Sequence, residues 1–178
     1  MVNSSSANAT PVLVMGVCGT GKTTVAQRVA QAVDGVFLDA DDFHPPENVA
    51  HMAAGLPLND EMRWDWLDLV AKGVIEAGRD GRTVVFACSA LKHSYRDRLR
   101  QSLGVMHLAH LTGPRDLIAE RMAARENHYM PIALLDSQLA DLEMPGPDEA
   151  PLSCDIREAP EALCAQILNA WGLTAPQV

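Results

Sequence analysis

Hydrophobic and polar positions follow two different periods along this chain. Short apolar runs predict five β-strands, at 12–16, 36–40, 83–88, 105–111 and, more weakly, 151–156. Segments with apolar residues at helical spacing separate these runs and predict helices at 22–33, 46–54, 60–78, 94–102, 114–126, 131–143 and 159–171. Strands that alternate with helices predict an α/β fold, a five-stranded parallel sheet with helices on both faces. Ligands of such a sheet bind beyond the carboxyl ends of its strands.

Length and composition narrow the class of protein. The 178 residues suit one domain, which we expect to span 11–178, after a disordered tail of small polar residues at 1–10. A net charge of −9 disfavours nucleic acid or an anionic membrane as the partner. The chain shows neither an apolar run long enough to span a membrane nor a signal peptide, so we expect a cytoplasmic protein. Its four cysteines form no C-x-x-C pair, which favours reduced thiols over a structural metal site.

Residues 16–23 read GVCGTGKT and match the P-loop pattern G-x-x-x-x-G-K-[ST]. Its glycines let the backbone curl so that N–H groups point at phosphate oxygens, and the following helix adds its N-terminus. Lys22 supplies a charge for the outer phosphates, and Thr23 a hydroxyl for Mg²⁺. Cys18 is either a reactive thiol or a small residue at a variable position. We therefore predict ATP binding by Gly16, Val17, Cys18, Gly19, Thr20, Gly21, Lys22, Thr23 and Thr24.

Three aspartates lie where the second predicted strand ends. Phosphoryl transfer to a hydroxyl needs a carboxylate to accept its proton and carboxylates near Mg²⁺. If the strand continues, Asp39 and Asp41 point to one side and Asp42 to the other. We assign Asp39 to Mg²⁺ through water and Asp41 to the acceptor hydroxyl; the alternative is that they are solvated turn or cap residues. His44 either donates to a polyol hydroxyl or caps the turn.

Several cations follow strand ends and suit an anionic acceptor. Arg63 lies in the first turns of a helix capped by Asn59 or Asp60, where a cation opposes the helix dipole, so we expect it to serve a ligand. Ser94 with Asp97 resembles a capping box and predicts a helix start there. Arg96 then lies close to the strand end, where a guanidinium can grip a carboxylate with two bonds. The predicted acceptor-binding residues are Asp41, His44, Arg63, Ser89, Lys92, Arg96 and His128.

Two segments depart from the strand–helix alternation. Residues 44–60, broken by prolines, suggest an acceptor-binding insert, and residues 121–131 suggest a mobile lid. Arg121 and Arg125 lie four residues apart on the predicted lid helix and are expected to contact triphosphate oxygens. His128 follows and is expected to touch substrate or adenine. The predicted catalytic residues are thus Lys22, Asp41 and Arg121.

Five blocks together resemble the gluconokinases, P-loop small-molecule kinases of the thermoresistant gluconokinase type. They are MGVCGTGKTT, DADDFHPPENVAHMAAGLPLND, ACSALKHSYRDRLR, RMAARENHY and LLDSQLADLEMP, and the resemblance covers residues 12 to 156. The resemblance implies an adenylate-kinase-like P-loop NTPase fold with a lid. It also implies Mg²⁺- and ATP-dependent phosphorylation of the 6-hydroxyl of D-gluconate, a homodimer and a cytosolic role in sugar-acid catabolism.

The chain also departs from this family's pattern. Members tend to carry Asp where Met62 stands, Pro where Asp65 stands and Gly where Asn127 stands. These changes bear on acceptor specificity and on lid motion, not on the reaction class. The alternative function is a kinase of the same fold that acts on another sugar acid, shikimate or a nucleoside monophosphate. A nucleotide-binding regulator without turnover is disfavoured by the joint presence of Lys22, Thr23, Asp41 and Arg121.

Overall fold

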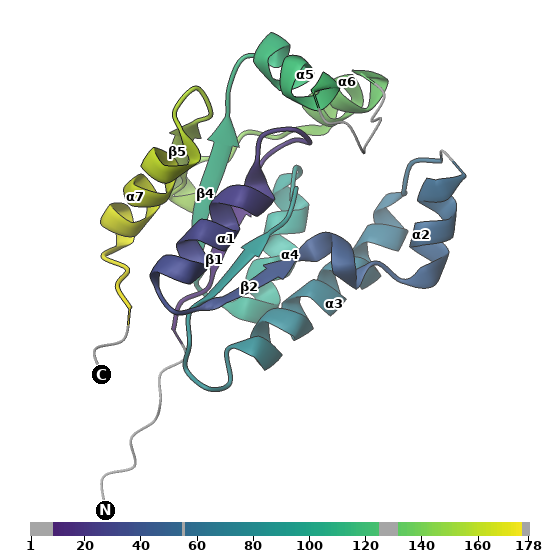
Figure 1. Ribbon diagram of the computed structural model, residues 1–178. Helices are drawn as coiled ribbons and strands as arrows, with labels where there is room; N and C mark the ends of the chain where they lie inside the picture. The colour runs from purple at the N-terminus through teal and green to yellow at the C-terminus, as the bar shows by residue number, and fades with distance from the viewer. Residues whose placement is uncertain (1–8, 55, 125–131, 176–178) are drawn as a thin grey trace, which may run out of the picture.

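A single parallel sheet organises the chain. The computed structural model describes residues 9–54, 56–124 and 132–175, and its sheet has the strand order β2-β3-β1-β4-β5 (Figure 1). The strands are β1 (Val12–Met15), β2 (Val36–Asp39), β3 (Val84–Ala87), β4 (His107–Thr112) and β5 (Leu152–Asp155). All five predicted strands are confirmed; β4 starts two residues later than predicted and ends one residue later.

The helices occupy the intervals that the periodicity predicts. They are α1 (Lys22–Ala32), α2 (Pro46–Ala53), α3 (Asp60–Ala77), α4 (His93–Leu103), α5 (Arg115–Ala123), α6 (Ile132–Asp141) and α7 (Pro160–Trp171), with 3-10 turns η1 (Ala40–Phe43) and η2 (Pro147–Glu149). None of the helices in the described ranges has the length and apolarity needed to cross a membrane. Most of the predicted lid, from residue 125 to 131, and most of the predicted tail, residues 1–8, lie outside the described residues.

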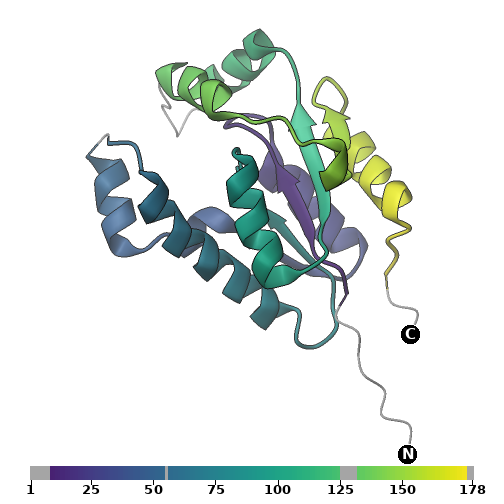
Figure 2. The same ribbon diagram turned by 180° about the vertical axis from the view of Figure 1, so that it is seen from behind.

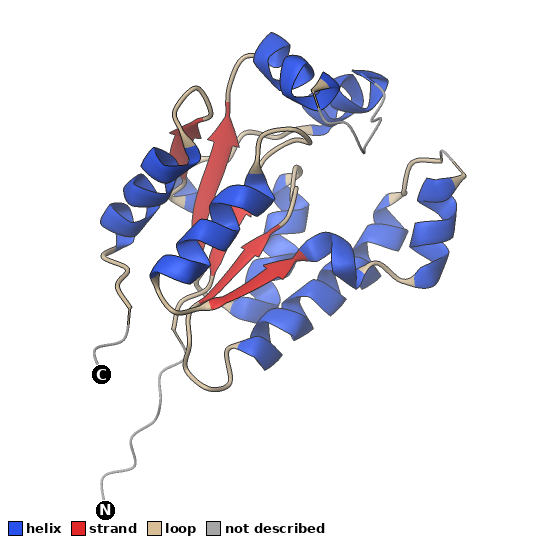
Figure 3. Cartoon of the chain, in the orientation of Figure 1, coloured by secondary structure: helices blue, strands red, loops and turns tan. Residues whose placement is uncertain are grey.

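Helices form one layer on each face of the sheet. Every residue of β1 is fully buried, and alternate side chains enter two separate cores: Val12 and Val14 meet the core of α1 and α7, whereas Leu13 and Met15 meet that of α3 and α4. Figures 2 and 3 show these layers, with α5 and α6 beyond the carboxyl ends of β1 and β4. The three-layer α/β/α prediction is confirmed, and the central strand delivers the P-loop to the edge where ligands bind.

A buried ion pair joins α4 to the turn before β5. The guanidinium of Arg96 is wholly buried and donates to both carboxylate oxygens of Glu149, at 2.7 and 2.8 Å. Its remaining nitrogen donates to the carbonyls of Ala90 and Leu91, and Arg100 adds a third bond to Glu149 at 2.6 Å. Because each charge has hydrogen-bonding partners, the pair fixes the loop after β3 instead of leaving a buried charge uncompensated.

The start of α4 differs from the predicted capping box. The helix begins at His93, so Ser94 lies inside it, and the preceding Lys92 makes no side-chain cap. The carboxylate of Glu143, from the segment after α6, accepts the His93 N–H at 2.6 Å instead. A residue 50 positions away therefore satisfies the helix end, and the negative charge also suits the helix dipole.

Acid should destabilise this fold in two stages. Burial, reinforced by Arg96, lowers the pKa of His110 from 6.5 to about 4, and it lies 2% exposed in β4. Although burial alone would raise it, hydrogen bonds from Arg96 and Arg100 lower the pKa of Glu149 from 4.5 to about 2. Both folded values are depressed, so each contribution is complete above the unfolded pKa and is lost as pH falls toward the folded one.

Because the unfolded chain takes up a proton at His110 that the folded chain does not, we expect this residue to lower the free energy of unfolding by about 3 kcal/mol between pH 6.5 and 4, at about 1.4 kcal/mol per pH unit. Urea unfolding at pH 7, 5.5 and 4 measures this slope. His110→Gln should flatten it in that window, whereas His51→Gln, a substitution of a histidine outside the core, should keep it. An unchanged slope in His110→Gln would show that other groups dominate.

Candidate functional site

The P-loop joins β1 to α1 in a curled backbone. Gly16 and Gly19 have φ of +151° and +81°, values that residues with a side chain rarely adopt. Neighbouring elements also crowd the loop, since a Cβ on Gly16 would lie 2.7 Å from the Leu111 carbonyl oxygen. A Cβ on Gly19 would lie 2.6 Å from Met122 Cγ. The glycines thus permit both the curvature and the close packing of the loop against β4 and α5.

Lys22 begins α1 and folds back over the loop. Its Nζ donates to the Val17 carbonyl at 3.0 Å, and Thr20 Oγ1 donates to the same oxygen at 2.8 Å. Burial lowers the pKa of Lys22, while nearby anionic groups oppose this shift, Asp41 most strongly and Asp39 less so. The lysine is therefore held at the mouth of the loop by a neutral carbonyl, and its ammonium group has further N–H donors for phosphate oxygens.

Thr23 and Asp39 bring together the oxygen atoms that a magnesium site needs. Thr23 Oγ1 donates to Asp39 Oδ2 at 3.0 Å, and Asp39 Oδ1 accepts the Asp41 N–H at 3.1 Å. A hydroxyl and a carboxylate are hard oxygen donors, which suit Mg²⁺ bound together with phosphates and water. The donor set fits the predicted metal role of these two residues.

Asp41 and Asp42 do not continue β2. The strand ends at Asp39, and both residues lie in the η1 turn, so the predicted alternation of side chains does not apply to them. Trp66 of α3 holds this turn, because its indole N–H donates to the Ala40 carbonyl at 2.7 Å. Asp39 caps the start of the turn through its carboxylate, which accepts the Asp41 N–H. The position of Asp41 is thus set by α3 and by the Asp39 carboxylate.

His44 closes the same turn. Its backbone N–H donates to the Asp41 carbonyl at 3.4 Å, and its ring stacks on Trp66 with centroids 4.4 Å apart. The side chain is 8% exposed, Nε2 lies 3.9 Å from Asp41 Oδ1, and burial lowers the pKa of His44. Nδ1 is buried without a hydrogen-bond partner within the part of the chain that the structure describes. The ring is therefore held neutral beside the Asp41 carboxylate.

The environment of Asp41 favours proton uptake. Displacement of bulk water by the surrounding chain raises the pKa of Asp41, and the neighbouring carboxylate of Asp39 raises it further. Lys22 and His44 oppose this shift. The side chain itself is 87% exposed, so an incoming hydroxyl can reach it. A solvent-accessible carboxylate with a raised pKa has the properties of a general base.

Between α3 and the start of α4, Arg63 and Lys92 are two cations that share the carboxylate of Asp60. Asn59 caps α3 as predicted, accepting the N–H three residues later at 2.9 Å. Asp60 accepts from the Tyr95 hydroxyl at 2.6 Å and from Lys92 Nζ at 3.1 Å. Arg63 in turn donates to the Tyr95 oxygen at 2.8 Å. Hydrogen bonds from Tyr95 and Lys92 lower the pKa of Asp60, so the group keeps one positive charge in excess.

Arg96 is wrongly predicted as an acceptor-binding residue. Its guanidinium is fully buried and is occupied by Glu149 and by two backbone carbonyls, so it presents no group to a ligand. The expectation failed because Glu149, 53 residues away, reaches Arg96 from the sheet's far edge. Ser89 is half-buried in the loop that Arg96 holds, and its acceptor role stays a prediction.

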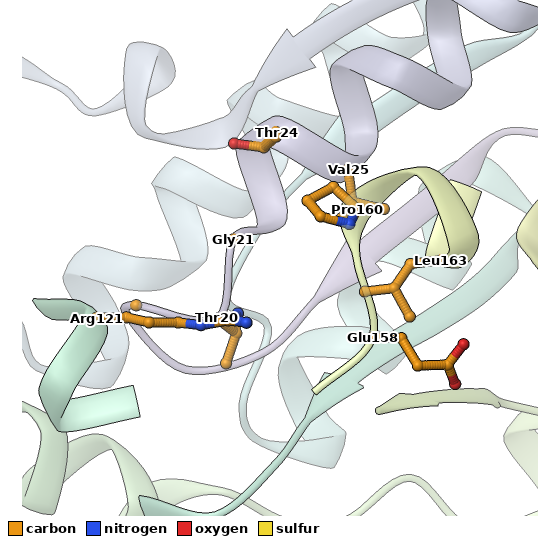
Figure 4. A pocket seen from close by; sticks show the side chains of 9 residues that line it. Thr20, Gly21, Thr24, Val25, Arg121, Glu158, Pro160 and Leu163 are labelled. Carbon is orange, nitrogen blue, oxygen red and sulfur yellow. The ribbon is translucent and has the colours of Figure 1, made fainter. Parts of the chain in front are cut away.

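A pocket of about 200 Å³ opens on the outer side of the P-loop (Figure 4). Arg121 borders it, and its Nη2 donates to the Ile156 carbonyl at 2.6 Å. Arg121 is thereby tied to the loop between β5 and α7, while Arg125 and His128 lie outside the described residues. The pocket is lined by Gly19, Thr20, Gly21, Thr24, Val25, Arg121, Glu158, Pro160 and Leu163.

The structure places several residues in the site to which the sequence patterns had assigned no role there. Gln138 accepts the Cys18 N–H at 2.7 Å, and Glu143 caps α4. Both belong to the block LLDSQLADLEMP, so the resemblance carried a signal for them without assigning a role. Tyr95 and Asp60 connect the two cations. The Cys18 thiol is buried beside Met122 Sδ at 3.6 Å, which favours the interpretation of a small packed residue over a reactive thiol.

Comparison with known proteins agrees with this geometry. The AAA domain family matches residues 12–145. The gluconokinase of Gluconobacter oxydans (strain 621H) is 40% identical over 158 residues, which cover 89% of each chain. The thermoresistant gluconokinase of Escherichia coli (strain K12) is 37% identical over 158 residues, covering 88% of this chain and 90% of its relative.

Solved structures show the same relationship. An unliganded sugar kinase from Janibacter sp. HTCC2649 is 43% identical, with a TM-score of 0.87 over 95% of this chain and 99% of its own. A gluconokinase from Sinorhizobium meliloti 1021 is 36% identical, with a TM-score of 0.82 over 93% of both chains. With a P-loop and this degree of identity over nearly the whole length, the chain belongs to the gluconokinase family of P-loop kinases.

Proposed function

We propose that this protein transfers the γ-phosphoryl group of ATP to the 6-hydroxyl of D-gluconate, giving 6-phospho-D-gluconate and ADP. The observation that carries this proposal is a chain of two hydrogen bonds from the start of α1 to the turn that bears the candidate base. Thr23, next to Lys22, donates to Asp39 at 3.0 Å, and Asp39 accepts the Asp41 N–H at 3.1 Å, so the phosphate-binding lysine and the candidate base share one site. Phosphoryl transfer needs these two groups at opposite ends of the same displacement.

The nucleotide occupies the P-loop and the pocket outside it. The backbone N–H groups of the loop and the start of α1 receive the phosphates, and Lys22, held by the Val17 carbonyl, donates through its other N–H groups to the outer phosphates. The pocket beside Arg121 takes the nucleoside, since it adjoins Gly21 and Thr24. The predicted catalytic role of Arg121 and the phosphate role of Arg125 stay proposals.

Thr23 and Asp39 would hold Mg²⁺, Asp39 through water. When bound, the ion neutralises charge on the phosphate oxygens during transfer. Because Asp39 Oδ1 accepts the Asp41 N–H, the metal-side carboxylate also orients the turn that carries the base.

Asp41, together with the two cations Arg63 and Lys92, receives the acceptor. Asp41 accepts the proton of the reacting hydroxyl, and the ring of His44 lies beside it, with Nε2 3.9 Å from Asp41 Oδ1. Arg63 and Lys92 attract the sugar acid's carboxylate, because Asp60 neutralises only one of their two charges. Ser89 and His128 remain proposed acceptor contacts.

We further propose that residues 11–178 act as one kinase domain, with 44–60 as acceptor-binding insert and 121–131 as lid, in a cytoplasmic homodimer. Exposed apolar side chains on and after α2, Val49 at 51%, Met52 at 41% and Leu56 at 51%, support an interface between copies. Light scattering should report twice the 19.2 kDa chain mass. A monomer at micromolar concentration would contradict the dimer.

The function is tested by ADP release from Mg²⁺ and ATP with D-gluconate, other sugar acids, shikimate or a nucleoside monophosphate as acceptor. We expect release to depend on gluconate, because the acceptor site combines a base with an excess cation for a carboxylate. Release stimulated only by another acceptor would keep the kinase and overturn the substrate. No stimulation by any acceptor would favour a nucleotide-binding regulator.

Asp41→Asn should lower kcat by ~10²-fold or more and leave ADP affinity nearly intact, because it removes the proton acceptor and not a phosphate contact. Asp42→Asn, on the neighbouring residue of the same exposed turn, is the matched control and should retain turnover. In the wild type, kcat should fall as pH drops through the raised pKa of Asp41, since only the ionised form accepts a proton. Equal activity of both variants would disprove the base assignment.

A further inference from the structure

The peptide unit between Val17 and Cys18 is held at both of its edges. Its N–H donates to Gln138 Oε1 of α6 at 2.7 Å. Its carbonyl oxygen accepts from Lys22 Nζ at 3.0 Å and from Thr20 Oγ1 at 2.8 Å. Side chains from two helices and from the loop itself therefore converge on one plane of the P-loop backbone.

These bonds are coupled by the covalent geometry of the peptide. A peptide unit is planar, with its N–H and C=O on opposite sides, so fixing the direction of one fixes that of the other. Gln138 thereby aims the Val17 carbonyl at Lys22 and Thr20. If the amide lost its acceptor, a part-buried N–H would be unpaired, and rotation of the unit would turn the carbonyl away from both donors.

The position of Gln138 on α6 indicates that it serves this bond. Leu135 and Leu139 of α6, together with Leu142 just after the helix, form an apolar stripe that packs into the core shared with α1. Gln138 interrupts this stripe with an amide, three residues after the wholly buried Leu135. A polar side chain at such a position costs free energy unless it is hydrogen-bonded, and the Cys18 N–H supplies that partner.

We propose that Gln138 is a positioning residue for nucleotide binding, acting on the P-loop through the Val17–Cys18 peptide. It holds the loop in the curved conformation that binds phosphate before the nucleotide arrives, so less conformational entropy of the backbone is lost on binding. This inference rests on the proposed function only in taking a nucleotide phosphate as the ligand of the loop.

The test is ADP binding to Gln138→Met, measured by calorimetry in the presence of Mg²⁺. Methionine has similar length and fills the stripe but offers no comparable acceptor. We expect an affinity about tenfold lower, equivalent to about 1.4 kcal/mol. Gln101→Met, on the exposed face of α4, is the matched control and should bind like the wild type. Unchanged or tighter binding by Gln138→Met would overturn the proposal, and because no acceptor sugar is used, the result stands whichever acceptor the enzyme phosphorylates.

Amide hydrogen exchange of Cys18 supplies a second readout that general destabilisation does not mimic. We expect this amide to lose protection in Gln138→Met, while the amides of β1 keep theirs. Gln138→Glu retains an acceptor of the same length and should keep Cys18 protected. Equal exchange at Cys18 in the wild type and Gln138→Met would refute the inference even if the affinities differed.

Discussion

The backbone of residues 16–23 has to curl around an anion while packed against β4 and α5, and the rest of the site is arranged around that constraint. Gly16 lies against the Leu111 carbonyl and Gly19 against Met122, so the loop has no room for side chains at these positions. β1 is buried on both faces and fixes where the loop begins, and α1 fixes where it ends. The carboxyl ends of β2 and β3 then place the carboxylates and cations at the same edge of the sheet.

Polar and charged side chains of the site are hydrogen-bonded to internal partners that a ligand can join. Lys22 rests on a carbonyl, Thr23 on Asp39, and Lys92 on Asp60. Such pairing keeps each side chain near its working position without a ligand, so less conformational freedom is lost on binding. An acidic protein can still hold a polyanionic nucleotide, because many of its arginines are paired with carboxylates elsewhere, whereas Lys22 rests on a neutral carbonyl and Arg63 and Lys92 share a single carboxylate.

Much of the distinctive sequence supports the site without touching ligand. Arg96 and Glu149 form a buried pair that fixes the loop after β3, and Glu143 caps the helix that follows. Trp66 holds the η1 turn through its indole N–H and stacks on His44. Removing either Arg96 or Glu149 would leave the other charge buried and uncompensated, so these two residues serve as scaffold and not as ligand contacts.

The sequence by itself determined the strand and helix intervals, the P-loop and a cap for α3 at Asn59 or Asp60, of which the structure shows Asn59, because periodicity, glycine spacing and capping act over a few neighbouring residues. It also assigned Asp39 and Thr23 to one predicted metal site, and a hydrogen bond joins these two side chains in the structure. Only the tertiary structure decided that Arg96 is internal, that Glu143 replaces the Ser94 cap and that Gln138 holds the Cys18 amide. Those partners lie 50 to 120 residues apart, and a hydrogen bond across that separation depends on how layers pack, which no local pattern encodes.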